Sequence, residues 1–297
     1  MGQRSWIFTV LMALMVSVSL FDAPAQTERP PGPRIPLHRT RLHRDDLEIG
    51  GDLVGVLTGQ SRFVNYTDLL ALPQVSVRVS GDTNFVGPVR IEGVLLESLP
   101  ALLGARPDAR LVTAICDDFY EAHYPIAYQQ AHHPILVLKV NGLDPLHWPL
   151  GSDKVPMGPY MISHAHFQSK MQVLSHREEP QIPWGVVRLD FENEAAVYRP
   201  ILPIGPDAQS LQVQQGYAIA RENCFRCHNR EGQGGTKAKR SWSVVARRAI
   251  TDPQWFATYV RAPNKINPAT QMSGSPQYDD ATIAALIAYF KPFAHAD

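Results

Sequence analysis

Cysteine is scarce in this sequence of 297 residues, which contains only Cys116, Cys224 and Cys227. Three thiols cannot build the disulfide framework of a small secreted domain, so cysteine number alone does not indicate the cellular compartment. Net charge is also absent, because 28 Lys and Arg residues balance 28 Asp and Glu residues. Nothing in this balance indicates nucleic-acid binding, which usually requires a basic excess.

Long apolar runs are missing too, apart from one near the N-terminus. Trp6–Phe21 is an almost unbroken apolar run of 16 residues, shorter than the roughly 20 residues of a membrane-spanning helix. Arg4 precedes this run and small residues at 23–25 follow it, so residues 1–25 are predicted to be a secretory signal peptide. If uncleaved, the segment would anchor the chain in a membrane. No cysteine follows it, which argues against a lipoprotein anchor.

The length of the chain favours two domains behind this signal. Residues 26–46 form a Pro/Arg-rich leader without a core of its own. We expect an N-terminal domain at 47–198, a Pro-rich linker at 199–209 and a C-terminal domain at 210–297. Three prolines within seven residues of the linker should make it semi-rigid.

The N-terminal domain has the pattern of a β-rich α+β fold, with short apolar segments about ten residues apart and many prolines. Val94–Leu103 has helical spacing with a pause at Pro100. Apolar alternation or short apolar runs predict strands at Val75–Val79, Leu111–Cys116, Ile135–Val140 and Val186–Phe191.

The C-terminal domain contains Cys224-Phe225-Arg226-Cys227-His228, a C-x-x-C-H motif. This pattern is typical of covalent c-type haem attachment, with one thioether from each cysteine and the histidine beside the iron. A zinc site or a thioredoxin-like redox pair also uses C-x-x-C. Zinc would need further ligands at matching spacing, and a thioredoxin-like pair a βαβ context; the surroundings here indicate helix and loop.

Helical segments surround the motif. Apolar residues from Leu211 to Ala220 predict a helix that runs into it, and Gly216 on this helix would let another helix cross closely. Asp252 and Pro253 are a natural N-cap and first helical residue for a second helix. A last helix is expected over Asp279–Phe290, with acidic residues in its first turn.

This order of elements resembles a class I monohaem cytochrome c. The matching runs are G-Y-x-x-A-x-x-x-C-x-x-C-H, W-x-x-x-Y-V-R-A-P, N-P-A-T-Q-M and L-I-A-Y-F. The resemblance implies an all-α domain in which Cys224 and Cys227 hold one haem c, His228 is the proximal iron ligand and Met272 the distal one. His295 is a rival for the distal position.

A second resemblance covers residues 50–195. The runs N-Y-T-D-L-L-A-L-P, G-V-L-L-E-S-L-P-A-L-L-G, D-D-F-Y-E-A-H-Y-P-I, P-I-L-V-L-K-V-N-G and P-W-G-V-V-R-L-D-F resemble the molybdopterin-binding domain of the sulfite oxidase family. That family binds molybdenum through a cysteine in a loop that here is Val79–Phe85 and has none, which argues against bound molybdopterin. Cys116 lies in a different segment and is interpreted as a small buried hydrophobic residue.

Histidines are frequent in the N-terminal domain, and His164 and His166 could share one strand face. With His147 or His123 they could form a metal site, since imidazole binds zinc, copper or iron. The alternative is that they are surface or hydrogen-bonded histidines, because no tight motif such as H-E-x-x-H is present.

Charge is unevenly distributed between the domains. Residues 201–297 hold 11 basic and 7 acidic residues, whereas residues 26–200 hold 16 basic and 20 acidic ones. A mildly basic haem domain could steer an acidic redox partner, although ordinary solvated charge gives the same count.

Taken together, the sequence predicts a periplasmic electron carrier that exchanges single electrons with a reductase or a terminal oxidase chain, with a cofactor-free docking domain fused to it. The resemblance to cytochromes also implies export, because haem attachment takes place outside the bacterial cytoplasm or in organelles. One alternative is a fused oxidoreductase whose N-terminal domain binds molybdenum or another metal and passes electrons to the haem. Another is a structural subunit of a larger complex.

Overall fold

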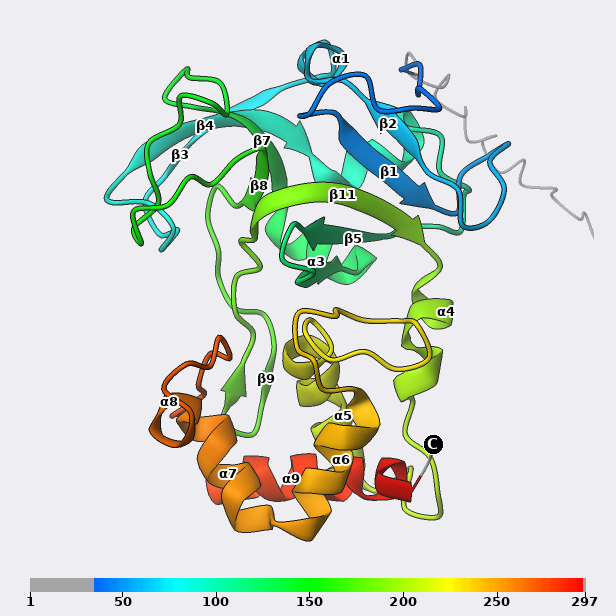
Figure 1. The fold of residues 1–297 in the computed structure, drawn as a ribbon, viewed down its shortest axis with the longest axis vertical. Helices are drawn as coiled ribbons and strands as arrows, with labels where there is room; N and C mark the ends of the chain where they lie inside the picture. The colour runs from blue at the N-terminus through cyan, green and yellow to red at the C-terminus, as the bar shows by residue number, and fades with distance from the viewer. Residues whose placement is uncertain (1–34, 296–297) are drawn as a thin grey trace, which may run out of the picture. The chain divides into compact units, whose positions relative to one another are not determined.

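The computed structural model of this chain describes residues 35–295, which form a sheet-rich N-terminal domain and a helical C-terminal domain (Figure 1). The predicted signal at residues 1–25 and the first part of the leader lie outside the described residues. Within the leader's described part, Ile35 and Leu37 pack against the first domain, and His38 pairs with Phe63. No helix among residues 35–295 has the length and apolar character needed to span a membrane.

A mixed sheet of nine strands is the frame of the N-terminal domain. Its main path runs β2-β1-β11-β8-β7-β4-β3, and β5 and β6 extend it from β11. Only β1 and β11 pair in parallel; the other neighbours are antiparallel. The strands are β1 (Leu47–Gly51), β2 (Arg62–Val64), β3 (Val75–Val79), β4 (Val89–Leu95), β5 (Leu111–Cys116), β6 (Glu121–Tyr124), β7 (Ile135–Val140), β8 (Tyr160–Ser163) and β11 (Trp184–Glu192).

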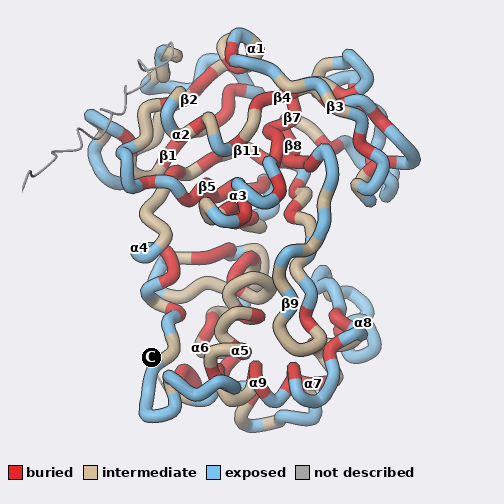
Figure 2. Tube along the Cα trace, turned by 180° about the vertical axis from the view of Figure 1, so that it is seen from behind, coloured by how far each residue is buried: buried red, intermediate tan, exposed pale blue. Residues whose placement is uncertain are grey.

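Strand β11 lies inside this sheet, and its residues alternate between a buried apolar face and a polar face. Leu189 and Phe191 are fully buried in the main hydrophobic core, where they meet residues of β1, β5 and β7. Arg188 and Asp190 alternate with them and form an ion pair on the opposite, polar face. Buried residues therefore concentrate along the central strands (Figure 2).

The four predicted strands are confirmed: three have the predicted bounds, and the last, β11, is longer at both ends than the predicted Val186–Phe191. The predicted helix over Val94–Leu103 is wrong in its first part, because Val94 and Leu95 belong to β4 and pair with β7. The helices of this domain are short: α1 (Tyr66–Leu70), the 3₁₀ turn Leu96–Ser98, α2 (Leu99–Leu102), α3 (Ile126–His132), α4 (Glu194–Tyr198) and the 3₁₀ turn Arg199–Ile201.

The described C-terminal domain is helical, as predicted. Asp252 caps its third main helix by accepting a hydrogen bond from the Trp255 amide at 3.1 Å, and Asp279 caps the last one through Thr282 at 2.8 Å. The elements are α5 (Leu211–Ile219), a π-helical turn (Ala220–Cys224), α6 (Trp242–Thr251), α7 (Pro253–Arg261), α8 (Pro263–Ile266), α9 (Asp280–Phe290) and the 3₁₀ turn Lys291–His295.

Aromatic side chains form the core of this domain. Trp242, at the start of α6, packs against Phe225 and Phe290 with ring centroids 5.6 and 5.1 Å apart. Tyr198 and Ile201, from the end of the first domain and the linker, belong to the same core. The linker is also tied down by a hydrogen bond of 2.6 Å from the Tyr289 hydroxyl to the Ile201 carbonyl.

Gly216 lets α5 and α9 approach closely, as the sequence predicts. A Cβ atom at this position would overlap the backbone carbonyl of Ala285 and the Cβ atom of Tyr289. Glycine is therefore required by the helix crossing itself and not by its backbone angles.

A β-hairpin of the first domain reaches the start of α9. Its strands, β9 (Gln172–Val173) and β10 (His176–Arg177), pair antiparallel. At its tip, the Ser175 amide donates to the Thr282 hydroxyl at 3.1 Å, and Ser175 Oγ accepts from the Asp279 amide at 2.9 Å. The hairpin thus makes a second connection between the domains, besides the linker.

We expect Gly216→Ala to destabilise the protein by about 1–3 kcal/mol, because the added methyl group must push α5 away from backbone atoms of α9. Thermal unfolding followed by circular dichroism measures this as a lower midpoint. Gly81→Ala is the control, since a Cβ atom there has no neighbour within 4 Å. Equal midpoints for the two variants would contradict the close crossing.

Candidate functional site

The C-x-x-C-H motif begins in the π-helical turn Ala220–Cys224 that continues α5. The Phe225 amide bonds back to the Ala220 carbonyl at 3.0 Å, and the His228 amide bonds to the Cys224 carbonyl at 3.0 Å. Single π turns inside helices often occur at functional sites. Here Cys224 ends the π-helical turn, and the hydrogen bond from the His228 amide back to Cys224 holds the rest of the motif close to it.

His228 is held by the loop that follows it. Its Nδ1 atom lies 2.6 Å from the Arg240 carbonyl oxygen, which can only accept, so Nδ1 carries the proton. The other nitrogen, Nε2, is then the one with a free lone pair for a metal. Burial lowers the pKa of His228, which favours the neutral ring that binds metals.

Two glycines allow this loop to fold onto the motif. A Cβ atom at Gly234 would meet the Phe225 ring, and one at Gly235 would overlap the Arg226 carbonyl. The Gly235 amide donates to the Phe225 carbonyl at 3.0 Å. The glycine-rich segment therefore packs tightly against the motif.

Both motif cysteines are free thiols in this structure. Burial raises the pKa of Cys224 to about 12, and burial also raises that of Cys227. Thiol exchange needs the thiolate, so these cysteines are poorly suited to thioredoxin-like chemistry. They remain suited to covalent attachment of a group beside them.

Met272 lies on the extended loop between α8 and α9, and 37% of it is exposed. The loop is fastened on both sides of this residue. Tyr259 contacts the Thr270 hydroxyl at 3.0 Å, and the Ser275 amide donates to the Val260 carbonyl at 2.9 Å. No hydrogen bond between the described residues links Met272 directly to His228. The side chain of His295, its rival, is outside what the structure describes.

A direct backbone contact joins the motif to the first domain. The Glu121 amide on β6 donates to the Arg226 carbonyl at 3.0 Å. The amides of Thr236 and Lys237 both donate to the Phe119 carbonyl at 3.1 Å. Phe119 has a φ of 65°, a left-handed conformation that is uncommon outside glycine and marks a locally constrained turn.

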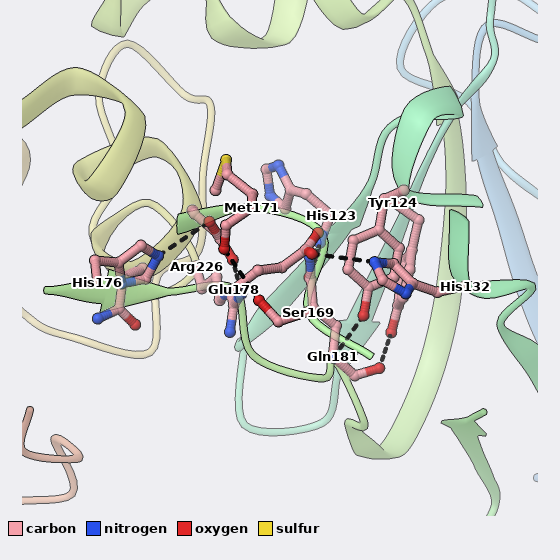
Figure 3. Close-up of polar contacts among 12 residues, drawn as sticks. His123, Tyr124, His132, Ser169, Met171, His176, Glu178, Gln181 and Arg226 are labelled. Atoms are coloured by element: carbon pink, nitrogen blue, oxygen red, sulfur yellow. Dashed lines mark hydrogen bonds and ion pairs between the residues drawn. The ribbon is translucent and has the colours of Figure 1, made fainter. Parts of the chain in front are cut away.

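The histidines of the first domain have separate partners. The expectation that His164 and His166 share a strand face is wrong, because β8 ends at Ser163. Among residues 35–295 no group of three or more His, Cys, Asp and Glu residues is arranged to hold a metal. The pairs are His123 with Glu121, His132 with Glu178 (both labelled in Figure 3), His133 with Glu97, His147 with Asp144, His164 with Tyr128, and His176 with both Glu222 and Tyr278.

The buried pair His176–Glu222 is a part of the site that sequence reasoning missed. His176 on the hairpin contacts Glu222 Oε2 at 3.0 Å through Nε2 and the Tyr278 hydroxyl at 2.7 Å through Nδ1. Asn223 also donates to that hydroxyl at 2.8 Å. Residues directly before Cys224 thus contact the first domain, and no local sequence pattern signals this pairing.

The loop Val79–Phe85 contains no cysteine and carries the carboxylate of Asp82. The Ser163 hydroxyl donates to Asp82 Oδ2 at 2.6 Å, and burial raises the pKa of Asp82. Cys116, the nearest thiol in sequence, is 4% exposed in the hydrophobic core, and burial raises its pKa. These residues do not fit a molybdenum site, since no thiolate is available at that loop.

Residues 211–290 match the family model described as cytochrome C oxidase, cbb3-type, subunit III. This region is a cytochrome c domain. Domains of this kind carry haem c and transfer electrons to and from protein partners. The match covers the helices α5 to α9, the motif and the Met272 loop.

One solved structure has a weaker similarity to part of the chain. The solved structure of the sulfane dehydrogenase SoxCD from Paracoccus pantotrophus matches with 14% identity and a TM-score of 0.33, over 58% of this chain. The chain spans 45% of the matched chain of that structure. The search of curated proteins found no match.

Glu192, at the end of β11, should make the stability of the sheet-rich domain depend on pH. Burial, and then Asp190, raise its pKa to about 7 from an ordinary 4.5. The raised value means that Glu192 favours folding while protonated. This contribution is complete below about pH 4.5 and is lost as the pH rises through about 7.

We therefore expect Glu192→Gln to raise the free energy of unfolding near pH 8 by at most about 3 kcal/mol relative to wild type, and to leave it unchanged near pH 4.5. A higher thermal midpoint near pH 8 measures this gain. The amide oxygen can still accept the hydrogen bond from Thr113. Glu231→Gln is the control, because that side chain is 63% exposed. A Glu192→Gln effect that is equal at both pH values would refute the raised pKa.

Proposed function

We propose that this chain is an exported monohaem cytochrome c that relays single electrons between redox partners. The observation that carries the proposal is the hydrogen bond from His228 Nδ1 to the Arg240 carbonyl, because it leaves Nε2 free to bind a metal. His228 follows two free cysteines in the motif. The haem iron, when bound, alternates between its ferric and ferrous states.

Each site residue has one role in this proposal. Cys224 and Cys227 form the two thioethers, and His228 binds the iron through Nε2. Met272 would supply the second protein ligand to the iron from its loop. With both protein ligands in place, the iron would transfer electrons rather than bind substrate, and a thioether ligand would raise its reduction potential.

We further propose export to the periplasm by residues 1–25, with a membrane anchor only if that segment is retained. The partners are redox proteins, a reductase on one side and a terminal oxidase chain on the other. We also propose that the two domains span residues 47–198 and 210–297, with residues 199–209 as the linker between them.

One observation favours the alternative of a fused oxidoreductase. An open hollow of about 370 Å³ lies mainly against β5 and β11, lined among others by Cys116, Glu121 and Thr236, and its volume would accommodate a small molecule. The absence of a thiolate in the Val79–Phe85 loop weighs against molybdopterin as the cofactor of such an enzyme.

Metal analysis of the purified, haem-loaded protein separates these two functions. We expect one iron per chain and no molybdenum or copper, because the Val79–Phe85 loop has no cysteine to bind molybdenum. Stoichiometric molybdenum or copper would instead establish the oxidoreductase.

Met272→Ala tests the axial ligand. We expect the ferric variant to lose the weak near-infrared band of methionine-ligated haem and to bind cyanide at the opened iron position. Met171→Ala, in the first domain, is the matched control and should keep the wild-type spectrum. If Met272→Ala also keeps it, another residue is the ligand.

A further inference from the structure

Arg226, between the two motif cysteines, is buried although its guanidinium is permanently charged. Its side chain is 10% exposed. Burial opposes the charge, but Tyr120 and Glu222 outweigh this and hold the pKa of Arg226 above its ordinary value. The molecule therefore keeps a fixed positive charge inside the motif, away from solvent.

The first domain is what buries this arginine. Strand β6 bonds to the Arg226 carbonyl through the Glu121 amide, and Arg226 Nη1 donates to the Tyr120 hydroxyl at 3.4 Å. The hairpin adds His176, which is 2% exposed and contacts Glu222. Figure 3 shows Arg226 together with His123 and His176 of the first domain.

The charge of Arg226 is only partly neutralised by its surroundings. Its nearest carboxylate oxygen, on Glu222, is 4.0 Å from Nη2, which is too long for a hydrogen bond. Glu222 instead uses its other oxygen for His176. Among the described residues, Arg226 Nε and Glu222 Oε1 have no hydrogen-bond partner.

Arg226 lies between the two attachment cysteines, two residues after Cys224 and directly before Cys227, so its charge is held beside both. A charge in a water-poor environment acts more strongly at a given distance than one at the surface, because the effective dielectric constant is lower.

We propose that the N-terminal domain is a cap on the haem attachment loop that buries Arg226 and thereby raises the reduction potential of the haem. A nearby positive charge favours the reduced iron, which carries one positive charge fewer than the oxidised iron. Glu222 opposes this effect, so the potential depends on both residues. The inference rests on the proposed function and gives the fused domain a role that needs no cofactor of its own.

The test is spectroelectrochemical titration of the full-length, haem-loaded protein and four variants. Arg226→Met removes the charge and keeps much of the side-chain volume, whereas Arg226→Lys keeps the charge. Glu222→Gln removes the opposing charge and can still bond to His176. Arg248→Gln is the control, because that arginine lies on α6 with a side chain 50% exposed and is screened by solvent.

We expect Arg226→Met to lower the midpoint potential and Glu222→Gln to raise it. Arg226→Lys and Arg248→Gln should stay near wild type. If Arg226→Met does not accumulate as holoprotein, an upward shift of the midpoint potential in Glu222→Gln alone supports the electrostatic effect. Midpoints of Arg226→Met and Glu222→Gln that equal wild type, even with lower thermal stability, would show that Arg226 is only structural.

Failure of this inference can be told from failure of the proposed function. A wild-type protein with the spectrum of His/Met-ligated haem, but with potentials insensitive to both substitutions, overturns the cap alone. A wild-type protein without covalent haem overturns the proposed function as well.

Discussion

The hydrogen bond from the Glu121 amide to the Arg226 carbonyl joins the edge of the sheet to the loop that carries both motif cysteines. An edge strand exposes unpaired backbone groups, and β6 satisfies one of them with the C-terminal domain instead of with solvent. The turn before β6 makes two more such bonds, from Thr236 and Lys237 to Phe119. The Tyr120 hydroxyl, from the same segment, accepts a hydrogen bond from Arg226, and the hairpin residue His176 contacts Glu222.

The two domains also share apolar packing. Tyr198 and Ile201 leave the first domain but pack with Phe225 and Trp242 in the second. The stacking of His123 on Tyr198, with ring centroids 5.8 Å apart, continues this contact into β6. The start of the predicted linker therefore belongs to the core of the second domain through Ile201, whereas Leu202 and Ile204 after it are exposed.

Local sequence patterns predicted the elements whose formation depends on neighbouring residues. Asp252 is predicted as a helix cap because the capping bond spans only three residues, and Gly216 is predicted to permit a close helix crossing because a side chain would block it. Asp279 is predicted as the first residue of the last helix, whereas in the structure it is the N-cap of α9. Helix α6 was not predicted; it contains the adjacent Arg247 and Arg248 and the β-branched Val244 and Val245, which have a lower helix propensity. Val94 and Leu95 have helical spacing, yet pairing with β7 makes them strand. His176 and Glu222 are 46 positions apart, so only the tertiary fold brings them together.

Covalent haem at Cys224 and Cys227 is the central claim, and intact-protein mass spectrometry of the mature, denatured chain measures it most directly. The account predicts the polypeptide mass plus one haem, and loss of that addition when both cysteines are replaced by alanine. A mass equal to the polypeptide alone, in protein exported together with the haem-attachment machinery, would contradict it.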